Sequence, residues 1–114
     1  MQYMLLINSG DAPATFNDLP EDQQSAILGE YMALSQDPAC SDANQLQPPE
    51  TAKTVRVKDG ETLTTDGPFA ETKEQLGGYY VIEADGLDRA LEAAKRCPGA
   101  KGGTIEVRPV MVFE

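Results

Sequence analysis

The chain contains no histidine, and it has only two cysteines among its 114 residues. Because imidazole is missing, the sequence excludes a Ser-His-Asp triad, a Cys-His dyad and a histidine-ligated zinc ion. Cys40 and Cys97 are not arranged as a CxxC pair. We expect two reduced thiols, with a disulfide between them as the less favoured alternative.

Basic residues are also scarce. Nine Lys and Arg face nineteen Asp and Glu, which gives a formal net charge of −10. All nine bases lie in residues 53–114, whereas residues 1–52 carry eight acids and no base. Nucleic-acid binding is disfavoured, because phosphate recognition needs clustered positive charge. We interpret the acidic first half as a solvated face that keeps the protein soluble; a surface that attracts a basic partner is the alternative.

No long hydrophobic run is present. Residues 1–7 are apolar but have no basic n-region, and Asn8-Ser9-Gly10 ends the run. This stretch is too short for a secretory signal or a membrane span. We therefore expect a cytoplasmic protein without a membrane partner. The length and the 40% of hydrophobic residues fit a single domain over residues 1–114 with one core.

Hydrophobic periodicity predicts strands and helices in alternation. Strands are expected at residues 1–7, 53–58, 61–65, 78–84 and 103–108, with a further strand at residues 110–113 after Pro109. The Asp59-Gly60 dipeptide between the second and third of these is a strong hairpin signal. Residues 38–49 read as a loop with a short extended piece around residues 43–46. Pro109 indicates a sheet edge, a bulge or a strand end.

Two helices complete the pattern. The first is expected to be capped by Asn17 or Asp18, to hold Pro20 in its first turn and to end at Pro38. The second is expected to be capped by Asp85. Its predicted core stripe is Leu87, Ala90, Leu91, Ala94 and Cys97.

This order predicts an α+β fold, a ferredoxin-like βαββαβ sandwich with an added hairpin. Both helices should pack on one face of an antiparallel sheet. The other face carries apolar strand residues, and a second subunit is the economical way to cover it. The sequence thus predicts a homodimer.

Residues 66–88, DGPFAETKEQLGGYYVIEADGLD, resemble the signature of the DGPF branch of the YciI-like (YCII-related) family. The similarity extends to Leu46-Gln47-Pro48-Pro49, to residues 54–57 and to Glu106-Val107-Arg108-Pro109. This resemblance implies a ferredoxin-like chain that pairs sheet to sheet as a dimeric α/β barrel. It also implies a regulatory or stress-linked role, since DGPF proteins are often encoded beside extracytoplasmic-function sigma factors.

The family's proposed chemistry does not carry over to this chain. Some YciI-like proteins have a His-Asp pair proposed as catalytic, and one relative is a dehydrochlorinase acting on an aromatic ring. The equivalent helix region here reads Glu21-Asp22-Gln23-Gln24. Glutamine is no general base near neutral pH.

Asp66, Glu71 and Lys73 are the candidate catalytic residues, as acid and base or as a carboxylate-binding set. The competing interpretation makes Asp66 a turn residue and the other two part of a solvated loop. Oxygen-only coordination of Mg²⁺ or Ca²⁺ is chemically possible, but neither EF-hand spacing nor a DxD pair is present. We expect no metal ion and no cofactor.

The candidate ligand-binding residues are Phe69, Gly77, Tyr79, Tyr80 and Arg108. Glycine at position 77 permits close approach of backbone to a strand or a ligand. Tyr79 and Tyr80 must point to opposite faces of their strand, so one packs under the helices and the other faces the partner sheet or a cavity. Arg108 is expected either to pair with Glu106 or Glu83 or to bind an anion.

Three functions remain open from the sequence. The leading one is a dimer that binds a small organic ligand in a cleft between the sheet and loop 66–78, in an accessory or regulatory role. The second is a lyase- or isomerase-like enzyme acting on a small aromatic or carbonyl compound. The third is an acidic interaction module for a sigma-factor-linked regulator.

Overall fold

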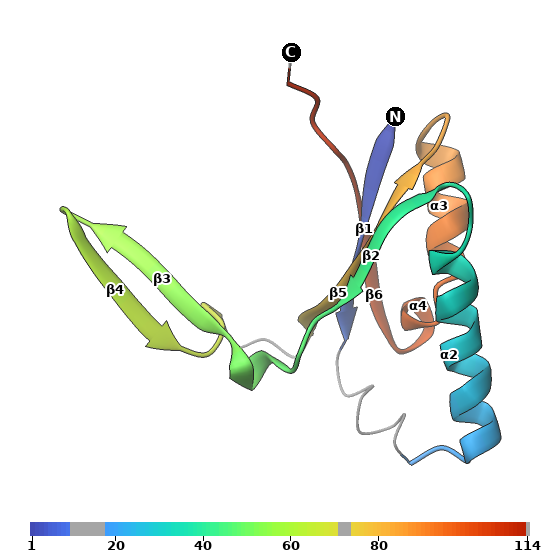
Figure 1. Cartoon of the computed structure of the whole chain (residues 1–114), viewed down its shortest axis with the longest axis horizontal. Helices are drawn as coiled ribbons and strands as arrows, with labels where there is room; N and C mark the ends of the chain where they lie inside the picture. The colour runs from blue at the N-terminus through green and yellow to red at the C-terminus, as the bar shows by residue number, and fades with distance from the viewer. Residues whose placement is uncertain (10–17, 71–73, 114) are drawn as a thin grey trace.

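A computed structural model describes residues 1–9, 18–70 and 74–113 of the chain (Figure 1). Three residues singled out in the sequence, Asn17, Glu71 and Lys73, lie outside the described residues.

Four antiparallel strands form the main sheet, in the order β2-β5-β1-β6. Their bounds are β1 Gln2–Ser9, β2 Cys40–Gln45, β5 Gln75–Glu83 and β6 Gly103–Pro109. The strand order and the alternation with helices are those of a ferredoxin-like fold, so the predicted α+β class is confirmed. The most apolar strand, β1, occupies a central position, where both of its edges are paired, with β5 and with β6.

Two main helices, α2 (Glu21–Ser35) and α3 (Leu87–Lys95), lie on one face of this sheet (Figure 1). The short helix α4 (Gly99–Gly102) leads into β6. Alternate residues of β1, Tyr3, Leu5 and Ile7, point toward the helices, as a strand's period of two requires. They form the core together with Leu34, Tyr80, Ile82, Ala90, Ala94 and Cys97.

The opposite face of the sheet, which we call the open face, has no helix on it (Figure 1). Met4 and Leu6 of β1 lie there, beside Val81 of β5, and all three are partly exposed. One cross-strand row runs Asp42, Val81, Met4, Arg108 over the four strands. The open face is thus apolar in its middle strands and polar at both edges.

Strands β3 (Lys53–Lys58) and β4 (Glu61–Asp66) form a separate two-stranded sheet, which we call the arm. The predicted hairpin is confirmed, because Asp59 and Gly60 both have positive φ (52° and 81°), as a tight two-residue turn requires. The arm projects away from the main sheet (Figure 1). Accordingly the radius of gyration is 16.1 Å, compared with roughly 13 Å for a compact domain of this length.

Neither Asp18 nor Asp85, the described residues that were predicted to cap the two helices, occupies an N-cap position. The N-cap of α2 is Pro20 and that of α3 is Gly86, and neither makes a side-chain capping bond. Asp18 and Asp85 therefore lie outside the cap positions. Glu21 and Asp22 in the first turn of α2 complement its dipole instead, and a proline loses nothing at a helix start because its missing N–H would be unpaired there.

Two further expectations need correction. The extended piece expected near residues 43–46 is a full edge strand, β2, which begins at Cys40. In α3, Ala90 and Ala94 are buried as predicted, but Leu87 and Leu91 are 50% and 40% exposed. The small alanines let the helix sit close to the sheet, so the bulkier leucines lie at the rim of the contact. The buried stripe of α3 is therefore narrower than the sequence spacing predicts.

Other expectations are confirmed. Both cysteines are free thiols, with Cys97 buried in the core. Pro109 is the last residue of β6, an edge strand, where its missing N–H costs no ladder bond. The strand expected at residues 110–113 is wrong, because the chain leaves the sheet after Pro109.

Candidate functional site

Two chain segments meet at the root of the arm, where it leaves and rejoins the main sheet. The N–H of Gly67 donates to the Ala52 carbonyl (2.7 Å), and the Thr54 hydroxyl donates to the Gly67 carbonyl (2.7 Å). Gly67 has φ of 87°, a conformation that favours glycine. An ion pair between Lys53 and Asp66 closes the same end of the arm. These contacts hold the two ends of the arm together.

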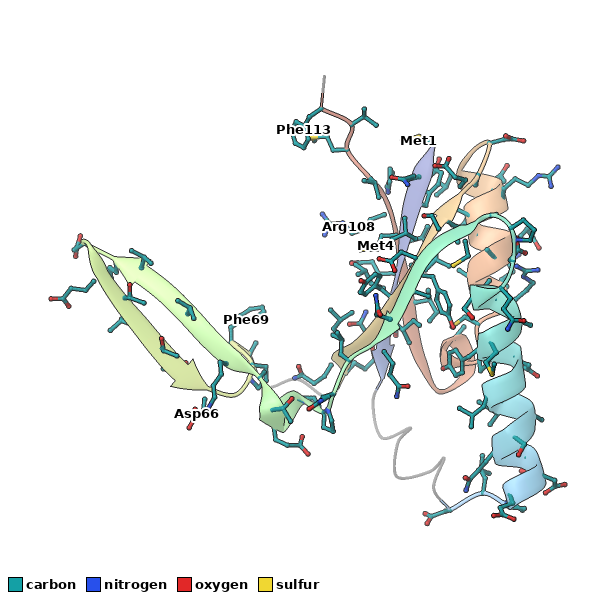
Figure 2. The ribbon with its side chains drawn as sticks, viewed as in Figure 1. Met1, Met4, Asp66, Phe69, Arg108 and Phe113 are labelled. Atoms are coloured by element: carbon teal, nitrogen blue, oxygen red, sulfur yellow. The ribbon has the colours of Figure 1, made fainter. Side chains whose placement is uncertain are left out.

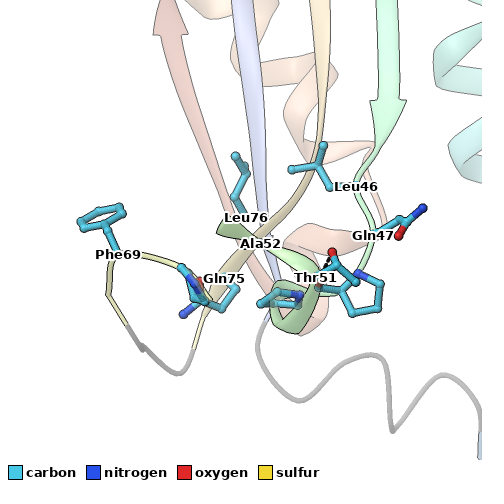
Figure 3. A pocket seen from close by; sticks show the side chains of 10 residues that line it. Leu46, Gln47, Thr51, Ala52, Phe69, Gln75 and Leu76 are labelled. Atoms are coloured by element: carbon cyan, nitrogen blue, oxygen red, sulfur yellow. Dashed lines mark hydrogen bonds between the residues drawn. The ribbon is translucent and has the colours of Figure 1, made fainter. Parts of the chain in front are cut away.

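A hollow of about 380 Å³ lies beside this root (Figure 3). Its lining comes from the segment between β2 and β3 and from the segment around the start of β5. The lining residues are Leu46, Gln47, Pro48, Pro49, Thr51, Ala52, Pro68, Phe69, Gln75 and Leu76. A hollow of this size falls within the range of about 300–1,000 Å³ that small-molecule sites occupy.

The hollow is mostly apolar and has stiff walls. Pro48 and Pro49 lead into the 3₁₀ turn η1 (Pro49–Thr51), and Pro68 follows the arm; each proline fixes its own φ. Among the polar side chains, the Thr51 hydroxyl donates to the Pro48 carbonyl (2.7 Å) and Gln75 Nε2 donates to the Ala70 carbonyl (3.1 Å). Gln47 adds an amide that can both donate and accept.

Of the candidate catalytic residues, only Asp66 is described. Its side chain is 87% exposed, it pairs with Lys53 across the arm, and it does not line the hollow. It stands at the end of β4, directly before the positive-φ Gly67, which fits the turn interpretation. The other two, Glu71 and Lys73, lie outside the described residues.

Phe69 is the one candidate ligand-binding residue that lines the hollow, and its ring is 81% exposed there (Figure 3). Gly77 lies at a bulge in β5: the register with β1 shifts between Ile7 and Asn8, and Gly77 has no partner on β1. The Gly77 carbonyl accepts a hydrogen bond from the N–H of Leu46 (2.8 Å). This bond holds the residue that follows β2 beside the bulge.

The two tyrosines point to opposite faces, as predicted. Tyr79 lies on the open face, where its hydroxyl accepts from Asn44 Nδ2 (2.8 Å) and donates to Asp42 Oδ2 (3.3 Å). Tyr80 lies under the helices and donates to the Tyr31 carbonyl (3.0 Å). Tyr80 is therefore a core residue, whereas Tyr79 is partly exposed on the open face.

Stability at high pH should depend on the buried tyrosines. Burial raises the pKa of Tyr80 and of Tyr31 to about 12, from an ordinary 10.0. The folded state therefore keeps these phenols neutral while the unfolded chain ionises. Their contribution to stability is complete below pH 10 and is lost between about pH 10 and 12. Urea unfolding from pH 9 to 11.5 should show a falling free energy, less steep in Tyr80→Phe; equal slopes would contradict this.

Arg108 lies on the open face, opposite Met4, and does not line the hollow (Figure 2). Within the described ranges it forms no ion pair, so the expected pairing with Glu106 or Glu83 is wrong; Glu83 pairs instead with the Met1 amine (3.2 Å). The anion-binding alternative stays a prediction. The hollow's second wall, residues 46–52, was not nominated from the sequence, although Leu46-Gln47-Pro48-Pro49 formed part of the resemblance that pointed to the family.

Comparison with known proteins agrees with this architecture. The model of the YCII-related domain matches residues 1–114. The chain belongs to the YCII-related family. An uncharacterised protein of Rhizobium meliloti (strain 1021) is 46% identical over 72 residues. That alignment covers 61% of this YCII-related chain and 58% of the relative, so the chain spans less than two thirds of the relative's length.

Two other features are absent from the described residues, a membrane-spanning helix and a cluster of metal ligands. No helix in that part of the YCII-related chain is long and apolar enough to cross a membrane. No three Cys, Asp or Glu side chains gather there as a set of metal ligands.

Proposed function

We propose that this chain is a cytoplasmic member of the DGPF branch of the YCII-related family that binds a small organic molecule at the root of its arm. The observation that carries the proposal is the hollow of about 380 Å³, mostly apolar and edged by Gln47, Thr51 and Gln75. Stiff apolar walls with a few placed polar groups suit a compact, partly apolar ligand such as a small aromatic carrying a carbonyl or hydroxyl. The accessory or regulatory role follows from the family resemblance.

The proposed protein acts as a homodimer, paired through the open face. This is supported by the uncovered apolar middle of that face, Met4, Leu6 and Val81. A two-fold dimer places the same patch of both copies together, so a face that is apolar at its centre and polar at its edges can pair with itself.

A ligand-binding role is favoured over the lyase- or isomerase-like alternative. Asp66, the described candidate base, is solvent-exposed and paired with Lys53 outside the hollow. Nothing in the described surroundings of this carboxylate excludes water from it, as a site for acid–base chemistry would. The acidic interaction module finds its support in α2, whose exposed acids include Glu21, Asp22 and Glu30.

Replacing Phe69 by alanine should weaken ligand binding and leave stability unchanged. The ring is already exposed, so its loss removes little folding energy. A ligand in the hollow would stack on it, and losing that contact should weaken binding about tenfold. Salicylate, catechol and 4-hydroxybenzaldehyde serve as probes, with binding followed by amide shifts of residues lining the hollow.

Phe113→Ala is the matched control, because Phe113 is equally exposed but lies in the C-terminal segment and not in the hollow. Binding of at least one probe should be unaffected in Phe113→Ala. The proposal is wrong if none of the probes shifts Leu46, Gln75 or Leu76, or if both variants bind equally well.

A further inference from the structure

The two faces of the arm differ in chemistry. One face carries Val55 and Val57 opposite Thr64 and Thr62, and the Lys53–Asp66 pair lies at its root; we call the four residues the valine face. The other face, which we call the charged face, carries Arg56, Lys58 and Glu61 together with Thr54, Leu63 and Thr65. Beyond its root the valine face has no charged side chain, and strands that differ in this way between their faces are typical of sheets that pack on one side.

The valine face is uncovered by the described part of its own chain. Val55 is 59% and Val57 71% exposed, although both are β-branched residues suited to a packed sheet surface. A lone two-stranded hairpin is marginally stable in water, and three strands or a packed face are normally needed. The hydrogen bonds at its root join Ala52 and Thr54 to Gly67, so they hold the two strands of the arm together. A projecting pair of strands with an uncovered apolar face indicates a docking surface.

The arm stands on the same side of the main sheet as the open face. Figure 1 shows the helices on one side of the sheet and the arm leaving on the other. Figure 2 shows Met4 and Arg108 directed to the side on which the arm stands. The arm and the open face therefore border the same space.

The arm is long enough to extend past the sheet of a second copy packed on the open face. Six residues per strand extend about 20 Å, whereas stacked sheets lie about 10 Å apart. A second copy packed on the open face would place its sheet about 10 Å away, with its helices beyond. The arm is thus long enough to pass beside the partner's sheet and reach its helix layer.

We propose that the arm clasps a second copy of this chain, packing its valine face against the partner that occupies the open face. By two-fold symmetry each copy would contribute one arm, so each arm covers the other copy. The inference rests on the proposed homodimer and adds to it which segment of each chain holds the partner. Because the hollow lies at the arm's root, the partner would also stand beside the ligand site.

Sedimentation equilibrium tests the clasp through a matched pair of variants. Val55→Thr/Val57→Thr removes apolar surface from the valine face while keeping β-branched side chains, and should raise the dimer dissociation constant about tenfold or more. Leu63→Thr makes the same kind of change on the charged face and should leave that constant unchanged. Circular dichroism checks that both variants keep the fold.

Photo-crosslinking gives a second measurement that does not depend on removing contacts. A benzophenone amino acid at position 62, on the valine face, should yield a covalent species of twice the 12.3 kDa chain mass. The same group at position 65, on the charged face, should yield far less. A crosslink confined within one chain would show that the arm folds back on its own sheet and would overturn the proposal.

The outcomes of these experiments distinguish the proposed contact between arm and partner, which we call the clasp, from the proposed homodimer and the proposed ligand binding. An unchanged dissociation constant in Val55→Thr/Val57→Thr, in a protein that remains dimeric, overturns the clasp alone. A wild-type mass of 12.3 kDa at micromolar concentration overturns both the clasp and the homodimer. Neither result touches ligand binding, which the Phe69→Ala comparison decides separately.

Discussion

Replacing Leu5 by alanine should lower the free energy of unfolding by about 3–4 kcal/mol. Leu5 is 0% exposed in the middle of β1, with Tyr80 and Val107 beside it on the two neighbouring strands. Truncation removes buried methyl groups and leaves a cavity that paired strands on both sides cannot close. Urea denaturation should show a lower midpoint with an unchanged slope, as expected for a loss of stability alone.

Leu28→Ala provides the control for this experiment. Leu28 lies on α2 with about half of its side chain exposed, and alanine is the better helix former. The loss there should be under about 1 kcal/mol. If Leu28→Ala destabilised the protein as much as Leu5→Ala, the core would not be centred on β1.

Gly78→Ala should be the second most damaging change, at about 2–3 kcal/mol. A Cβ at position 78 would lie 2.8 Å from the carbonyl oxygen of Asn44 and 3.4 Å from the Cα of Gln45. Both atoms belong to the backbone of β2, so no side chain can turn away to make room. The edge strand must shift, and its amides should exchange with deuterium faster than in the wild type.

The same substitution at Gly29 should have the opposite sign. An added Cβ there meets nothing within 4 Å, and the residue lies inside α2. Alanine in a helix interior is better than glycine by about 0.5–1 kcal/mol. Comparing the two variants therefore isolates the contact with β2 from any general effect of glycine, and two losses of similar size would contradict the close approach at Gly78.

Features with a local cause were predictable from the sequence. The arm's turn depends on two residues, Asp59 and Gly60, whose types tolerate the positive φ that a two-residue hairpin turn requires. The alternation in β1 follows from a strand's period of two, and it correctly separates Tyr3, Leu5 and Ile7 from the open face. The order of elements then leaves few topologies, which is why the ferredoxin-like class could be predicted.

Features that depend on neighbours were predicted poorly. β2 reads CSDANQ, without apolar alternation, because an edge strand is paired on one side and needs little burial. Leu87 and Leu91 fit helical spacing but lie outside the contact, which the alanines of α3 define. The turn chemistry predicts that a hairpin forms, but it contains no information on the direction in which the hairpin projects.

Only one of the two walls of the candidate site was predicted from the sequence. The motif pointed to loop 66–78 and to Phe69, which lines the hollow. The facing wall comes from residues 46–52, whose prolines read simply as loop residues until the fold brings them opposite Phe69 and Leu76. Tyr80 shows the converse: its place beside Tyr79 suggested a ligand contact, and only packing under α2 reveals a core role.

The order of pairing in the main sheet has a consequence for biosynthesis. β1 pairs only with β5 and β6, and β2 pairs only with β5, so no ladder of this sheet can form before β5 has been made. About 75 residues separate Leu5 from Tyr80, which takes the ribosome about 4–15 s at roughly 5–20 residues per second. During translation β1, the most apolar strand, therefore stays unpaired for this time, whereas β3 and β4 can already pair with each other to form the arm. Chaperone dependence in the cell should therefore centre on β1.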